Sequence, residues 1–164
     1  MAATYEPIAT TTLGSAASSI TFSSIPATYS DIRLVLTAKD ATGSGYVKLT
    51  FNNDTGTNYS RTLIYGDGSA AGSASNTNQA FIRMNSGLST TIPELLTADI
   101  FSYAGSTYKT ALVTANEDKN GSGLIYSIVG LWRSTSAINR IDLSNSVNNF
   151  AIGTTATLYG IKAA

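Results

Sequence analysis

Apolar and polar residues alternate along most of this chain, in short runs that are separated by Gly, Ser, Asn and Asp. In the run 31–38, for example, Ile32, Leu34 and Leu36 occupy every second position. A repeat of two residues is typical of a β-strand, because successive side chains of a strand point to opposite faces. We therefore expect strands that bury one face on a core.

The same pattern predicts about eleven short strands and gives little support to helices. The predicted strands lie near 5–12, 18–23, 31–38, 45–52, 60–65, 79–85, 95–103, 107–115, 123–132, 137–143 and 155–162. A short turn of helix is allowed near 93–96, where Pro93 precedes Glu94. So many short strands indicate a single all-β domain over 1–164, built as a two-sheet sandwich. A jelly roll is the favoured form of this sandwich, and a closed barrel is the alternative.

Two polar segments interrupt the strands and are expected to be loops. They are NNDTGTN at 52–58 and the low-complexity GDGSAAGSASNTN at 66–78. Hairpin geometry places them at opposite ends of the strand near 60–65. At the N-terminus, Pro7 cannot donate to a central ladder. Residues 1–12 are therefore expected to form either an edge strand or an extended arm that adds to a neighbouring sheet.

Composition limits the partners that the domain can take. Of the 164 residues, 12% are charged, and the ten basic and ten acidic residues are scattered along the chain. Because there is no basic stripe or polybasic patch, we expect no nucleic-acid partner and no membrane partner. The N-terminus lacks the charged and apolar regions of a secretory signal peptide, so we expect synthesis in a cytoplasm.

Composition also limits the chemistry. The sequence has no histidine and no cysteine, which are the usual general base and the thiolate nucleophile. Glu117 and Asp118 are adjacent in a predicted hairpin loop, where side chains usually point into water. No serine lies in a GxSxG elbow. We therefore predict a protein that is not an enzyme, with no catalytic residues, no cofactor and no metal site.

Three features have two interpretations each. Asn53 and Asp54 offer oxygen ligands to a cation, but the same residue types form tight turns, which is the interpretation we favour. Asp67 lies between two glycines and has the same two interpretations, a cation ligand or a turn residue, of which we favour the turn residue. Trp132 could stack on a sugar ring or could fill the core or a subunit interface, and we favour the second.

Several motifs in this order resemble a family of small phage virion domains. The motifs are FNNDTGTNYS at 51–60, LIYGDGS at 63–69 and TATLYGIK at 155–162, with an early SITFSSIPATYSDIRLVL and a late YSIVGLWRSTSAINRIDL. The family consists of β-sandwich modules of tail fibres and of capsid decoration proteins, which are also called cement or head-fibre proteins. The resemblance spans roughly 18–162 and implies attachment to a virion, usually as a trimer.

The leading hypothesis is a capsid decoration protein on the virion surface, made in the host cytoplasm and seated on the major capsid protein as a homo-oligomer. Strand-like sequence begins almost at Met1, without the shaft that a tail fibre uses. The alternative is a tail-fibre receptor-binding module that recognises a host surface glycan, and an enzyme such as a depolymerase is a third hypothesis. The candidate interaction residues are Tyr5, Pro7, Ile8, Asn53, Asp54, Asn58, Asp67 and Trp132.

Overall fold

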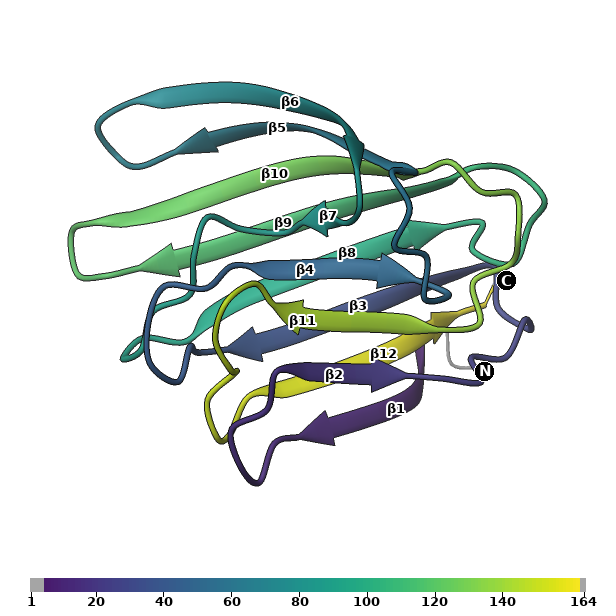
Figure 1. Cartoon of the computed structure of the whole chain (residues 1–164), viewed down its shortest axis with the longest axis horizontal. Coiled ribbons are helices and arrows are strands. Elements are labelled where there is room, and N and C mark those ends of the chain that lie inside the picture. Colours follow the sequence, from purple (N-terminus) through teal and green to yellow (C-terminus); the bar gives the residue numbers. More distant parts are fainter. Residues whose placement is uncertain (1–4, 163–164) are drawn as a thin grey trace.

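The computed structural model describes residues 5–162, which form twelve β-strands and, within that range, no helix (Figure 1). The strands are β1 (Tyr5–Thr12), β2 (Ser19–Phe22), β3 (Asp31–Ala38), β4 (Val47–Phe51), β5 (Tyr59–Gly66), β6 (Ala71–Gln79), β7 (Ile82–Arg83), β8 (Glu94–Phe101), β9 (Lys109–Asp118), β10 (Gly123–Trp132), β11 (Ile141–Asn145) and β12 (Thr155–Ile161). Among the described residues, no helix is long and apolar enough to cross a membrane.

The strands form two antiparallel sheets that face each other (Figure 1). The large sheet has eight strands in the order β1-β12-β3-β8-β9-β10-β5-β6, and the small sheet has four in the order β2-β11-β4-β7. Side chains from the inner faces of both sheets make the core, and Leu34, Leu49, Val113, Leu143 and Leu158 are all fully buried. The prediction of an all-β, two-sheet sandwich is confirmed.

Two hairpins extend the large sheet. β5–β6 lies between β4 and β7 in the chain, and β9–β10 lies between β8 and β11, yet all four strands pair within the large sheet. The tips of both hairpins point to the same side of the molecule (Figure 1). Of the other eight strands, four lie in the large sheet in the order β1-β12-β3-β8 and four in the small sheet in the order β2-β11-β4-β7, and the chain changes sheet at every step except from β4 to β7.

Two sequence predictions were wrong. The segment 66–78 is not a loop throughout, because Ala71–Gln79 forms β6 and pairs with β5 from Gly66 to Tyr59. Its small polar residues have weak strand propensity, so the pairing partner supplies the ordering. The helical turn near 93–96 is also absent from the described chain, because Glu94 already begins β8 and pairs with Ala38.

The N-terminal segment is an edge strand of its own sheet. β1 pairs with β12, from Tyr5 opposite Ile161 to Thr12 opposite Thr155, with a bulge between Pro7 and Ala9. Of the two interpretations of 1–12, the edge strand therefore describes residues 5–12, and residues 1–4 lie outside the described range.

Candidate functional site

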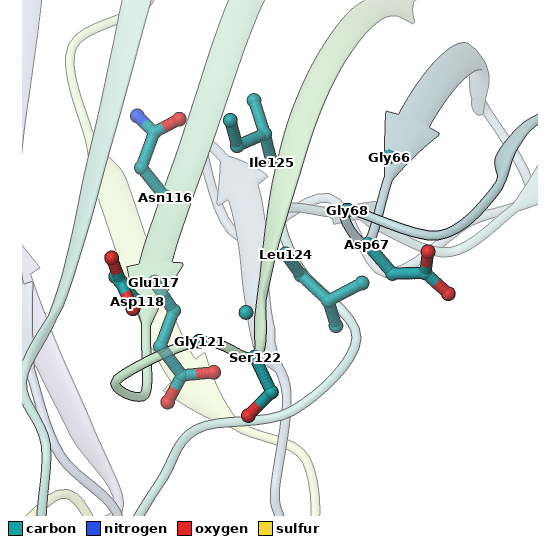
Figure 2. Close-up of a pocket in the computed structure, with 11 residues that line it drawn as sticks. Gly66, Asp67, Gly68, Asn116, Glu117, Asp118, Gly121, Ser122, Leu124 and Ile125 are labelled. Carbon is teal, nitrogen blue, oxygen red and sulfur yellow. The ribbon is translucent and has the colours of Figure 1, made fainter.

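A cleft of about 500 Å³ lies between the tips of the two hairpins (Figure 2). The β5–β6 turn forms one wall of the cleft and the β9–β10 turn forms the other. The two hairpins are joined at the base of the cleft, where Gly66 pairs with Ile125. Its lining residues are Gly66, Asp67, Gly68, Asn116, Glu117, Asp118, Gly121, Ser122, Gly123, Leu124 and Ile125. The cleft thus combines an apolar wall with several carboxylates.

The exposed carboxylates of the cleft also shape its two turns. Asp67 Oδ1 accepts hydrogen bonds from the backbone N–H groups of Ser69 and Ala70, at 2.8 and 2.7 Å. These bonds lower the pKa of Asp67, and Gly68 takes a left-handed φ of 86°. In the other turn, Asp118 Oδ1 accepts a bond from Asn120 N at 2.8 Å. Asp67 is therefore a turn residue, as the sequence indicates, and its carboxylate remains an anion at neutral pH.

Glu117, by contrast, is not a solvated loop residue. It lies in β9 with 6% of its surface exposed, on the same face as the core residue Ala115, so the expectation from the sequence was wrong for this side chain. Glu117 Oε2 pairs with Lys119 Nζ at 2.9 Å, while its Oε1 is buried without a hydrogen-bond partner. The β8–β9 register sets Leu95 opposite Asn116, so Glu94 lies opposite Glu117 on the buried face.

Glu94 and Glu117 form a buried carboxyl pair below the cleft. Glu94 is 2% exposed, and its Oε2 accepts a hydrogen bond from Asn85 Nδ2 at 2.5 Å. Burial, together with the smaller effect of the negative charge of Glu117, raises the pKa of Glu94 to about 7, against the opposing effect of the Asn85 bond. A pKa near 7 leaves a substantial fraction of Glu94 protonated at neutral pH, which reduces the repulsion between the two buried carboxyl groups.

The 52–58 loop is built around another carboxylate. Asp54 Oδ2 accepts a hydrogen bond from the indole Nε1 of Trp132 at 2.6 Å and one from Asn58 Nδ2 at 2.9 Å, and Oδ1 accepts one from Gly56 N at 2.9 Å. Burial raises the pKa of Asp54, but these donors outweigh burial and the net pKa is lowered. Asn53, which is exposed, takes the left-handed φ of 56° that a tight turn uses. The loop geometry therefore agrees with the turn interpretation.

Trp132 lies in the core. It is 2% exposed, its ring is stacked on Tyr59 at a centroid distance of 6.3 Å, and Phe51 packs on it at 5.5 Å. Both neighbouring rings occupy space that a sugar would need, so the interpretation of Trp132 as a stacking platform is wrong. The core interpretation is confirmed, and the indole N–H explains why Asp54 sits beside it.

We expect Asp54→Ala to lower the free energy of unfolding by about 1–3 kcal/mol, because the buried indole N–H of Trp132 loses its acceptor. Chemical denaturation monitored by tryptophan fluorescence measures the change. Asp67→Ala is the matched control, because Asp67 caps an exposed turn and touches no core group. An equal loss in the two variants would contradict the role of the Trp132 bond.

The remaining candidate residues lie far apart in the sheet order. Tyr5, Pro7 and Ile8 are on β1, at the opposite edge of the large sheet from the β5–β6 hairpin that carries Asp67. Tyr5 is 48% exposed and has the Arg33 guanidinium 5.9 Å from its ring centre, while Ile8 packs against the core. The structure thus unites Asp54, Asn58 and Trp132 but does not join them to the N-terminal residues.

Sequence reasoning missed an apolar surface on the large sheet. Six exposed apolar side chains project from the outward positions of β5, β8, β9 and β10; we call them the outer apolar face, and they are Ile64, Leu95, Phe101, Leu112, Ile125 and Val129. Register places Val129 beside Leu112, and Asn116 between Ile125 and Leu95. The sequence does contain a sign of this surface, because in each strand these apolar residues occupy the positions that alternate with the buried ones.

The outer apolar face carries little charge. Among the described residues, the outward positions of β5, β9 and β10 hold one charged side chain, Asp118 at the end of β9. On β8, the outward Asp99 is neutralised by Arg33 of β3 through contacts at 2.5 and 2.7 Å. Apolar side chains gathered on an almost uncharged sheet face, here interspersed with Thr, Ser and Asn, are typical of a protein–protein contact.

No group of three or more Asp, Glu, His or Cys residues within 5–162 is arranged to hold a metal ion. The arrangement of this chain can offer a neutral, apolar contact surface, an acidic cleft and a buried carboxyl pair.

Comparison with protein-family models, with curated proteins and with solved structures found no match to this chain.

Proposed function

We propose that this chain is a structural protein of a phage virion, a capsid decoration (cement) protein that seats on the major capsid protein and stabilises the shell. The observation that carries the proposal is the outer apolar face, which is broad and almost uncharged. Such a surface favours contact with another protein through shape and apolar burial rather than through electrostatic attraction. The proposed role is mechanical and needs no catalytic group.

The strand order adds support from the fold. We infer that the eight strands outside the two inserted hairpins form a jelly roll, since they have the orders β1-β12-β3-β8 and β2-β11-β4-β7 and the chain changes sheet at every step except from β4 to β7. Virion proteins use the jelly roll widely because it packs two sheets with few exposed edges. In this proposal the hairpins β5–β6 and β9–β10 enlarge the outer face on which the contact is made.

Copy number on particles tests the proposal. Quantitative mass spectrometry of purified tailed-phage particles that contain this chain should give on the order of tens to hundreds of copies per particle, because a symmetric shell repeats each docking site. A count of a few copies, located at the tail, would contradict the proposal and favour the tail-fibre hypothesis.

A surface variant tests the outer apolar face itself. We expect the double variant Leu112→Asp, Val129→Lys to fold normally, because both side chains are already partly in water and the two introduced charges, which lie opposite each other, have opposite signs. Its binding to particles stripped of the native protein should fall by at least about tenfold, since the change places charge in an apolar interface. Val147→Asp is the matched control, because Val147 is 76% exposed and lies outside that face. Unchanged binding of the double variant would exclude this face as the docking surface.

A further inference from the structure

The large sheet ends in an unusual edge strand. β6 is the outermost strand on one side, runs for nine residues and reads AGSASNTNQ, without a charge or a proline (Figure 1). Natural sheets usually protect such an edge with lysine, proline, a bulge or a short strand, because its unpaired backbone groups recruit other strands. β6 carries one of these devices, a bulge near Thr77 and Asn78, and is regular from Ala71 to Asn76.

The other three edges of the sandwich are protected. β1 contains Pro7 and a bulge, β2 has four residues, and β7 has two. Within the described chain, β6 is therefore the edge that best offers a long, uncharged strand to a partner. β6 pairs with β5 alone, so about half of its N–H and C=O groups point away from the sheet.

The surroundings of this edge suit close approach by another sheet. Ala71, Gly72 and Ser73 have small side chains and, with Ile64 and Ile125, line a shallow apolar depression of about 580 Å³. Ile64 and Ile125 are each 64% exposed. Over Ala71–Asn76, the side chains of β6 itself are small and uncharged, and the larger side chain beside them is that of Tyr65 on β5, next to Gly72.

We propose that β6 pairs edge to edge with β6 of a second copy of this chain, over Ala71–Asn76, so that two eight-stranded sheets become one. A two-fold axis sets this segment against itself, so any charge in it would face its own copy. The segment has none, and its small side chains leave the backbones free to approach. The inference concerns the chain in solution and does not require the capsid proposal, although Ile64 and Ile125 belong to both surfaces.

Light scattering coupled to size-exclusion chromatography, over a dilution series, tests this pairing. We expect the wild-type protein to have twice the chain mass of 17.1 kDa. Ser73→Lys should weaken the dimer by about tenfold or more, because it puts two like charges near the axis. Ala9→Lys is the matched control, since it places the same charge on β1, the opposite edge of the same sheet, and should leave the dimer intact.

Circular dichroism of each variant shows whether it keeps the native fold, and the mass of the wild-type protein tests the proposal without any variant. A monomeric wild-type protein overturns the proposal. So does a dimer that Ser73→Lys leaves unchanged, or one that Ala9→Lys disrupts equally. A trimer, as the family resemblance implies, also overturns it, because a three-fold axis cannot pair one β6 with another.

Discussion

Trp132→Ala should lower the free energy of unfolding by about 3–5 kcal/mol, the range for removing a large aromatic side chain from a core. Trp132 is 2% exposed and packs on Phe51 and Tyr59, so its removal leaves a cavity between the end of β10 and the small sheet. The change also removes the donor that lies 2.6 Å from Asp54 Oδ2, which loosens the 52–58 loop. Urea denaturation followed by circular dichroism measures the loss.

Val129→Ala is the matched control for this prediction. Val129 lies on the same strand with its side chain on the outer face, where it is 49% exposed. We expect that change to cost less than about 1 kcal/mol, since partly exposed positions lose little packing. Equal costs at the two positions would contradict the assignment of Trp132 to the core.

The stability of the protein should fall as the pH rises from about 5 to about 8, relative to a Glu94→Gln variant. The pKa of Glu94 is raised from 4.5 in the unfolded chain to about 7 in the folded protein. Between these values the folded state binds more protons, so raising the pH favours unfolding. The full difference is about 3 kcal/mol, at 1.36 kcal/mol for each unit of pKa.

Urea denaturation of both proteins at several pH values checks this result. Glu94→Gln keeps the shape of the side chain but cannot ionise, so the variant should be the more stable protein at pH 8. Glu6→Gln is the control, because Glu6 is on β1 and its bond with Lys162 lowers its pKa. Removing Glu6 should therefore leave the loss above pH 5 unchanged. Parallel pH profiles for wild type and Glu94→Gln would refute the raised pKa of Glu94 in the folded protein.

Alternation of apolar and polar residues predicts which face of a strand is buried, even at a position where a charged residue would be expected to lie in water. In β9, Lys109 shares its phase with Ala111 and Val113, and all three are buried. The sequence does not explain how a lysine tolerates that position. In the structure its Nζ donates to the backbone carbonyls of Gly105 and Thr107, while burial lowers its pKa. Those carbonyls come from a loop whose path depends on the whole fold.

The candidate site was predictable in part. The turn roles of Asp54 and Asp67 followed from residue types that accept hydrogen bonds from their own backbone. The bond between Asp54 and Trp132 joins residues far apart in the chain, and no local pattern indicates it. The pairing of Glu94 with Glu117 depends on the register of two strands, which also lies beyond local sequence.

The sequence by itself determined that this chain is an all-β sandwich, because alternation and turn residues act over a few neighbouring positions. It also placed most of the strands, including β1, β3 and β10 at their observed bounds. Only the tertiary structure decided that Ala71–Gln79 is an edge strand, since its small polar residues order through pairing with β5. The same holds for the outer apolar face, because the sheet order alone makes neighbours of β8, β9, β10 and β5.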